Sequence, residues 1–85
     1  MSIATAAPAV LEPLTPRESE VIELVCRGLS NEEICQELYI SMNTVKTFIR
    51  GAYRKIGVDT RARAVIWGFH NGYGDDSLLP TPAVA

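Results

Sequence analysis

Four helix-start signals, each followed by a short apolar stripe, constrain the fold of this 85-residue chain more than any other feature. Residues 15–18 (Thr-Pro-Arg-Glu) and 30–33 (Ser-Asn-Glu-Glu) both match a capping box, in which a Ser or Thr and a Glu three residues later bond each other's backbone. Ser41 starts a third helix, and Asp59 or Thr60 starts a fourth. The predicted helices span 16–27, 31–38, 42–56 and about 60 to near Gly72.

The chain is predicted to be all-α, a four-helix bundle, because no segment alternates apolar and polar residues as a strand does. In the last helix, one face carries Ala62, Val65, Ile66 and Phe69, and we expect that face to pack on the core. The folded domain is expected over 14–73. The flanking segments 1–13 and 74–85 lack helical periodicity and contain prolines, so we expect them to be disordered tails.

Composition argues against several classes of protein. No apolar run is long enough to cross a membrane and no signal peptide is convincing, so we expect a cytoplasmic protein without membrane contact. Cys26, Cys35 and the single histidine, His70, do not form a metal-site or disulfide pattern; buried thiols are expected, with a redox switch at Cys35 as the alternative. There is no nucleophile-and-base set and no phosphate-binding glycine loop, so we expect no enzyme, cofactor, metal or small-molecule ligand.

The charges are divided between the two halves of the chain. The net charge is −2, which by itself argues against a nucleic-acid partner. However, residues 12–40 hold seven glutamates against two arginines, a net −5, whereas residues 41–63 hold six cations against Asp59, a net +5. Because a partner responds to the field within about 10 Å, this division matters more than the sum.

The second and third predicted helices are joined by only about three residues, which is typical of a helix-turn-helix motif. Counted from Asn31, the positions that this motif needs apolar or small are all filled suitably, by Ile34, Cys35, Leu38, Ile40, Val45 and Phe48. The turn position that usually holds glycine holds Tyr39.

The face of the 42–56 helix opposite its apolar stripe is polar and cationic. We call it the α-helical ridge, or simply the ridge, and it consists of Asn43, Lys46, Thr47, Arg50 and Arg54. Such a helix fits the major groove of DNA, where Lys and Arg donate to guanine and Thr bonds to bases or touches a thymine methyl. A solvated helix face without a partner is the alternative for the ridge taken alone.

Several linked motifs resemble those of the LuxR-type (GerE-like) helix-turn-helix domain. They are Leu14-Thr15-Pro16-Arg17-Glu18, Gly28-Leu29-Ser30-Asn31-Glu32-Glu33-Ile34, Ile40-Ser41, Thr44-Val45-Lys46-Thr47, Tyr53-Arg54-Lys55-Ile56-Gly57-Val58 and Arg61-Ala62-Arg63-Ala64-Val65. The resemblance covers about 14–72 and implies a four-helix domain that binds double-stranded DNA in a bacterial transcriptional regulator, alone or as the output domain of a response regulator.

The resemblance also implies roles for individual residues. Lys46, Thr47 and Arg50 are expected to contact bases. Contacts to the DNA backbone are expected from Ser41, Met42, Thr44, Tyr53, Arg54, Lys55 and Arg61. Relatives form a homodimer on DNA through the fourth helix, which here would use Ala64, Trp67, Gly68 and Asn71. RNA polymerase is a further candidate partner, and the competing hypothesis is a protein-interaction module whose basic face docks an acidic protein.

Overall fold

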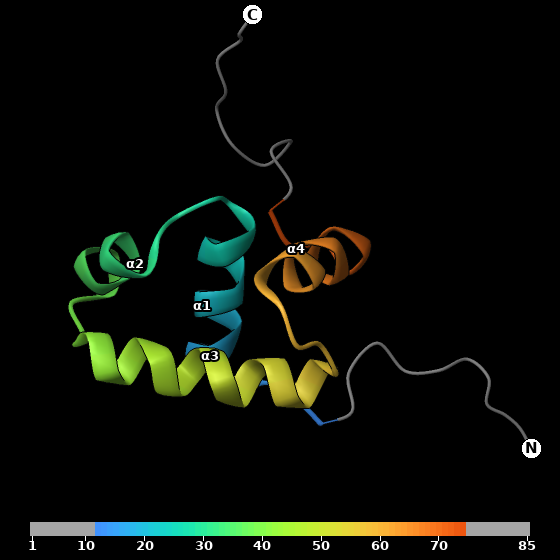
Figure 1. Ribbon diagram of the computed structural model, residues 1–85, viewed down its shortest axis with the longest axis horizontal. Coiled ribbons are helices and arrows are strands. Elements are labelled where there is room, and N and C mark those ends of the chain that lie inside the picture. The colour runs from blue at the N-terminus through green and yellow to red at the C-terminus, as the bar shows by residue number, and fades with distance from the viewer. Residues whose placement is uncertain (1–11, 75–85) are drawn as a thin grey trace, which may run out of the picture.

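The computed structural model describes residues 12–74, in which four helices follow one another without a strand (Figure 1). The helices are α1 (Pro16–Cys26), α2 (Asn31–Leu38), α3 (Met42–Ile56) and α4 (Arg61–His70). The all-α prediction is therefore confirmed for this part of the chain. Most of the two predicted tails, 1–11 and 75–85, lies outside the described residues.

The predicted helix starts are also confirmed. In both capping boxes, the one at Thr15 and Glu18 and the one at Ser30 and Glu33, each side chain bonds the other residue's backbone N–H. Ser41 caps α3, and Thr60 rather than Asp59 caps α4. The caps supply hydrogen-bond partners for the N–H groups that the start of a helix leaves unpaired. Short polar residues in the sequence therefore predict where helices begin.

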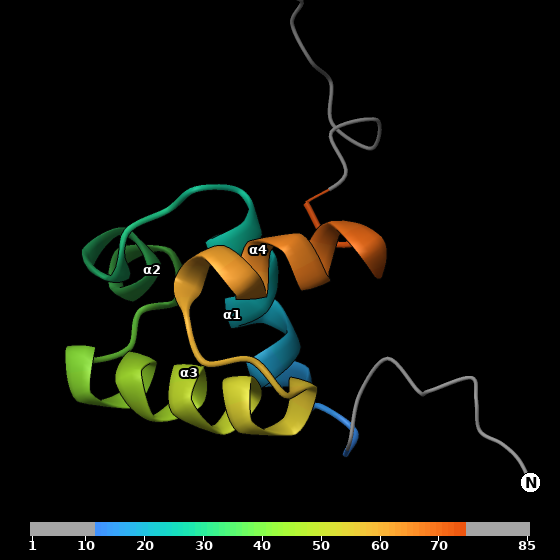
Figure 2. The same ribbon diagram turned by 45° about the vertical axis from the view of Figure 1, so that its right-hand side comes forward.

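Helix α1 lies at the centre, where it packs against each of the other three helices, and α3 packs against both α1 and α2 (Figures 1 and 2). One core cluster joins α1 to the helix-turn-helix pair through Val21, Val25, Ile34 and Val45. A second cluster, formed by Ile22, Cys26, Ala52 and Ile56, joins α1 to the C-terminal half of α3. This arrangement holds α3 along one edge of the molecule.

The predicted core face of α4 is confirmed for Val65, which packs against the first core cluster, and is wrong for the other three residues. Ile66 and Phe69 are 57% and 59% exposed, and Ala62 is exposed too, whereas Ala64 and Gly68 are buried. A β-carbon added at Gly68 would overlap Cys26 Sγ, so α4 approaches α1 through its smallest residues. Apolar residues occur on nearly every side of α4, so the sequence alone does not show which side is buried. The close approach of α4 to α1 leaves room only for the small residues on the buried side.

The turn between α2 and α3 contains the one described residue other than glycine that has a positive φ. Tyr39 ends α2 at φ 58° and ψ 45°, in the left-handed region that favours glycine, and its side chain is 92% exposed. The departure from glycine therefore changes the residue and not the shape of the turn.

Among residues 12–74, no helix has the length and apolar character needed to cross a membrane.

Candidate nucleic-acid interface

The outer side of α3 carries no part of the core. All five residues of the ridge are exposed, whereas Val45, Ala52 and Ile56 on the opposite side of α3 are buried. In Figures 1 and 2, α1, α2 and α4 all lie on the same side of α3, and its other side faces no other helix. The ridge thus presents three cations, Lys46, Arg50 and Arg54, on a surface that a partner can reach.

The start of α3 is organised by two hydroxyls. Ser41 Oγ accepts a hydrogen bond from the Thr44 N–H at 3.1 Å and donates to Thr44 Oγ1 at 2.9 Å. Since Ser41 is exposed and Met42 and Thr44 are half-buried, the first turn of α3 lies at the protein surface. Helix N-termini favour anions, so this turn is chemically suited to a phosphate beside the ridge.

Thr47 is exposed, but its hydroxyl is engaged. Oγ1 donates to the backbone carbonyl of Asn43, one turn earlier, over 2.9 Å. This bond leaves the hydroxyl able only to accept from another group. The ridge therefore places the Thr47 side chain, with its hydrogen-bonded hydroxyl and its methyl group, between the cations of Lys46 and Arg50.

Lys55 does not belong to the exposed cationic surface, which corrects the expectation that it contacts DNA phosphate. Its ammonium lies 2.8 Å from Glu18 Oε1, and both side chains are largely buried. Burial alone would raise the pKa of the Glu18 carboxyl, but the bonds from Lys55 and from the Thr15 backbone, with the charge of Lys55, hold that pKa below its usual range. Lys55 is a structural residue that joins α3 to the start of α1.

This ion pair lies against Gly51, in the middle of α3. A β-carbon at Gly51 would lie only 2.8 Å from Glu18 Oε2. Gly51 is buried, so the missing side chain makes room for the carboxylate next to the backbone of α3. Sequence reasoning missed this group because Glu18 and Lys55 are 37 residues apart.

Arg61 connects the start of α4 to the loop before α2. Its guanidinium donates to Asn31 Oδ1 at 2.9 Å and to the Leu29 carbonyl at 2.6 Å, yet the residue is exposed.

Tyr53 is half-buried, and burial raises the pKa of its hydroxyl although the nearby charge of Arg61 acts in the other direction. Tyr53 therefore stays neutral at physiological pH, with a hydrogen to donate.

Helix α4 presents an apolar surface different from the predicted one. Ala64 and Gly68 are covered by α1, and this burial corrects the expectation that they meet a partner subunit. Trp67 is half-buried, with its ring centroid 5.4 Å from that of Tyr73, and Asn71 is exposed beyond the last turn. The exposed apolar residues are Ala62, Ile66 and Phe69, which we call the α4 outer face. Beside it is a hollow of about 460 Å³ lined by Gly57, Val58, Arg63, Ile66 and Trp67.

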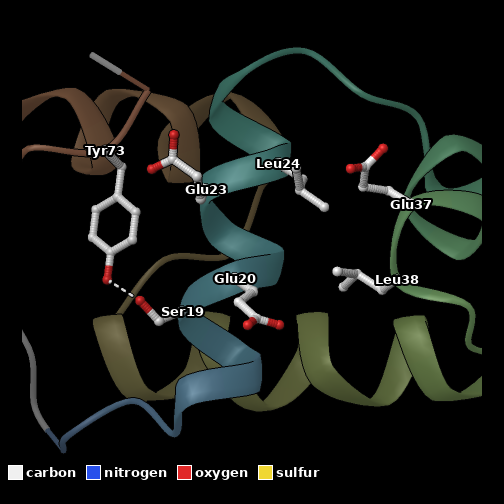
Figure 3. A pocket seen from close by; sticks show the side chains of 7 residues that line it. All are labelled: Ser19, Glu20, Glu23, Leu24, Glu37, Leu38 and Tyr73. Carbon is white, nitrogen blue, oxygen red and sulfur yellow. Dashed lines mark hydrogen bonds between the residues drawn. The ribbon is translucent and has the colours of Figure 1, made fainter. Parts of the chain in front are cut away.

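A different pocket lies beside α1, and three of the side chains that line it are carboxylates. It has a volume of about 380 Å³ and is lined by Ser19, Glu20, Glu23, Leu24, Glu37, Leu38 and Tyr73. Figure 3 shows four of these side chains on α1, with Glu37 and Leu38 on α2 to one side and Tyr73 on the other. Ser19 Oγ and the Tyr73 hydroxyl are hydrogen-bonded over 2.8 Å. Two of these carboxylates pair with arginines, Glu20 with Arg17 and Glu23 with Arg27, so their charges are largely compensated. The exposed cations of the ridge therefore make the α3 side the more favourable one for an anionic partner.

Cys26 is buried, and its thiol is poorly suited to react. Burial raises the pKa of Cys26 to about 11, with a smaller contribution from the charge of Glu23. A thiol with so high a pKa is a poor nucleophile at neutral pH. Among residues 12–74 no three His, Cys, Asp or Glu side chains are grouped as a metal site.

Comparison with known proteins matches most of the described part of the sequence to a family model. The family model described as "Bacterial regulatory proteins, luxR family" (GerE) matches residues 12–67. The chain is 38% identical over 68 residues to the "Uncharacterized transcriptional regulatory protein YxjL" of Bacillus subtilis, an alignment that covers 80% of this chain and 31% of that protein.

Two further relatives carry similar names. The "CsgBAC operon transcriptional regulatory protein" of Escherichia coli is 45% identical over 58 residues, which cover 68% of this chain and 27% of the relative. The "HTH-type transcriptional regulator MalT" of Vibrio campbellii is 44% identical over 54 residues, covering 64% of this chain and 6% of the relative. The chain thus spans less than a third of each of these three proteins.

The names of all three relatives describe transcriptional regulators, and none describes an enzyme. The family model covers well over half of the chain, and the four helices and the helix-turn-helix pair fit the fold that it represents. The chain therefore belongs to the luxR family of bacterial regulatory proteins.

Proposed function

We propose that this chain binds double-stranded DNA in a sequence-specific manner, with α3 in the major groove. The observation that carries the proposal is the ridge, whose three cations and two short polar residues are exposed together on a helix that the core holds at one edge of the molecule. The major groove is wide enough for a helix, and its base edges offer acceptors to Lys and Arg.

Within this proposal, base contacts come from Lys46, Thr47 and Arg50, which lie within about one turn of each other on α3. The long cationic side chains can donate to guanine O6 and N7. Positioning contacts to phosphate come from the surrounding surface, namely Ser41, Met42, Thr44, Tyr53, Arg54 and Arg61. Arg61 can serve this role while it braces α4, because a guanidinium has five N–H donors and the two described bonds use only part of them.

We further propose that two copies bind DNA together through the α4 outer face. Ile66 and Phe69 are large, apolar and more than half exposed, and the adjacent hollow includes Ile66 and Trp67. Exposed apolar side chains of this size are typical of contact surfaces. In this arrangement Trp67 and Asn71 lie at the margin of the contact, and Ala64 and Gly68 support it from inside.

The proposed biological role is transcription regulation, as the names of the relatives state for those proteins. We also propose that this chain is the output part of a response regulator and that it contacts RNA polymerase. The acidic pocket on α1 lies away from the ridge, so a protein partner could approach that side while α3 holds DNA.

The first experiment selects DNA fragments from a random pool and measures binding by fluorescence anisotropy at several salt concentrations. We expect log affinity to fall steeply with log salt, because Lys and Arg release counterions from phosphate. Arg50→Ala should cost about 1–3 kcal/mol on the selected site and relax its sequence preference. Arg27→Ala is the matched control, since it removes one positive charge that pairs with Glu23 on α1. Absent or salt-insensitive binding contradicts the proposal and favours docking of an acidic protein.

The second experiment tests the dimer on duplexes that carry one half-site or two. Ile66→Ser with Phe69→Ser should abolish cooperative binding to paired half-sites and leave binding to a single half-site unchanged. Ala62→Ser is the control for a smaller change on the same α4 outer face. Equal losses on both duplexes would contradict the proposed interface.

A further inference from the structure

We propose that Thr47 reads a 5-methylpyrimidine, thymine in unmodified DNA, through its side-chain methyl group and not through its hydroxyl. This inference rests on the proposed function and deepens it, because it assigns a base class to one position of α3. It starts from the bond that Thr47 Oγ1 donates to the Asn43 carbonyl over 2.9 Å.

That bond determines which part of the threonine faces outward. The acceptor is a backbone carbonyl one turn earlier in the same helix, so the hydroxyl is turned along the helix surface and toward its backbone. The methyl group occupies a different tetrahedral position on the same β-carbon. Because the residue is exposed, the methyl group covers part of the surface that α3 presents to a groove.

The same bond also limits what the hydroxyl can do. Its single hydrogen is committed to Asn43, so it cannot donate to the acceptors of guanine, adenine N7 or thymine O4 without breaking an existing bond. It could still accept from the amino group of cytosine or adenine. The methyl group needs no such partner, and the apolar group that a major groove offers is the 5-methyl of thymine.

The neighbouring residues favour this division of roles. Lys46 and Arg50 supply donors on either side of Thr47, and both are exposed. Donors of this kind suit the acceptor edges of guanine, whereas an apolar group between them discriminates a methylated pyrimidine. The three positions therefore offer two different chemistries to successive base pairs.

The experiment replaces each thymine of the selected half-site in turn by uracil, which removes only the 5-methyl group. For the unmodified protein we expect about a fourfold loss of affinity at one thymine per half-site, the factor that corresponds to burial of one methyl group. Thr47→Ser keeps the hydroxyl and its bond but lacks the methyl group, so it should bind thymine and uracil equally at that position. Thr47→Val keeps a methyl group and lacks the hydroxyl, so it should retain the discrimination.

The outcomes separate this inference from the proposed function. If the unmodified protein binds no selected DNA, the proposed function itself fails. If it binds DNA but every uracil substitution is neutral, or if Thr47→Ser still discriminates uracil from thymine, the methyl assignment is overturned. Loss of affinity in Thr47→Val with full affinity in Thr47→Ser would assign the contact to the hydroxyl instead. Circular dichroism of each variant checks that α3 is still folded.

Discussion

Lys55 Nζ lies 2.8 Å from Glu18 Oε1, and this pair fastens the middle helix of the core to the helix that carries the ridge. The same carboxylate oxygen accepts the Thr15 N–H at 2.9 Å, so one glutamate both caps α1 and anchors α3. A cation for which the family resemblance implied a DNA contact thus forms an ion pair between α3 and α1, in addition to the two core clusters that join these helices.

Lys55→Ala should therefore affect stability much more than DNA recognition. Removal of one partner leaves a largely buried charge uncompensated, and we expect the free energy of unfolding to fall by about 3 kcal/mol. Urea denaturation measures this change. DNA affinity of the folded protein, measured at low temperature, should fall less than in Arg50→Ala. A normal unfolding midpoint together with a uniform loss of affinity on all sequences would instead restore Lys55 to the phosphate contacts.

The double variant Glu18→Gln with Lys55→Met provides the matched test. It removes both charges while roughly preserving volume, and replacement of a buried ion pair by uncharged residues is often near neutral. We expect the double variant to recover most of the stability lost in Lys55→Ala. If it is as unstable as the single variant, the loss comes from the packing of the Lys55 stem and not from the unpaired charge.

Acid should weaken the fold through Glu18. Its pKa is lowered in the folded state, so the unfolded chain takes up the proton more readily. The stability that Glu18 contributes is present above the ordinary glutamate pKa of about 4.3 and is lost as pH falls through the lower folded-state pKa. Urea midpoints between pH 6 and pH 3 should decrease more steeply for the unmodified protein than for Glu18→Gln. Glu32→Gln removes one carboxylate at an exposed position and is the control for the loss of a charge.

Gly51→Ala should not show the usual gain from replacing a helical glycine. An exposed helical site would gain about 1 kcal/mol from this change. Here the new β-carbon would lie 2.8 Å from Glu18 Oε2, and the bonds to Lys55 and Thr15 oppose movement of that carboxylate. We expect a loss of about 1 kcal/mol, and a gain of about 1 kcal/mol when the same change is made in the Glu18→Ala background. Equal effects in the two backgrounds would show that the two residues are not coupled.

Tyr39→Gly should stabilise the protein. The left-handed conformation costs a residue with a β-carbon about 1–2 kcal/mol, part of which the greater freedom of glycine in the unfolded chain cancels. We expect a net gain of about 0.5–1 kcal/mol in thermal or urea unfolding. Tyr39→Ala retains the β-carbon and removes only a 92% exposed ring, so its stability should change little. A gain in Tyr39→Ala equal to that in Tyr39→Gly would assign the effect to the ring and not to the backbone.

The sequence alone determined the number, order and starts of the helices, because capping and helical periodicity are local properties of a few neighbouring residues. It also determined the ridge, since residues three and four apart on one helix share a face whatever the helix packs against. These local rules account for α1, α2 and α3 and for the exposed positions proposed to meet DNA.

Only the tertiary structure decided which groups form contacts inside the folded chain and which remain exposed to a partner. The short α4 has apolar residues on most sides, and its close approach to α1 buried Ala64 and Gly68 and left Ile66 and Phe69 outside. In the sequence Lys55 resembles a surface cation, and only the folded chain brings Glu18, 37 residues away, beside it. Both outcomes depend on distances between helices, and such distances follow from the packing of the whole core and not from any local pattern.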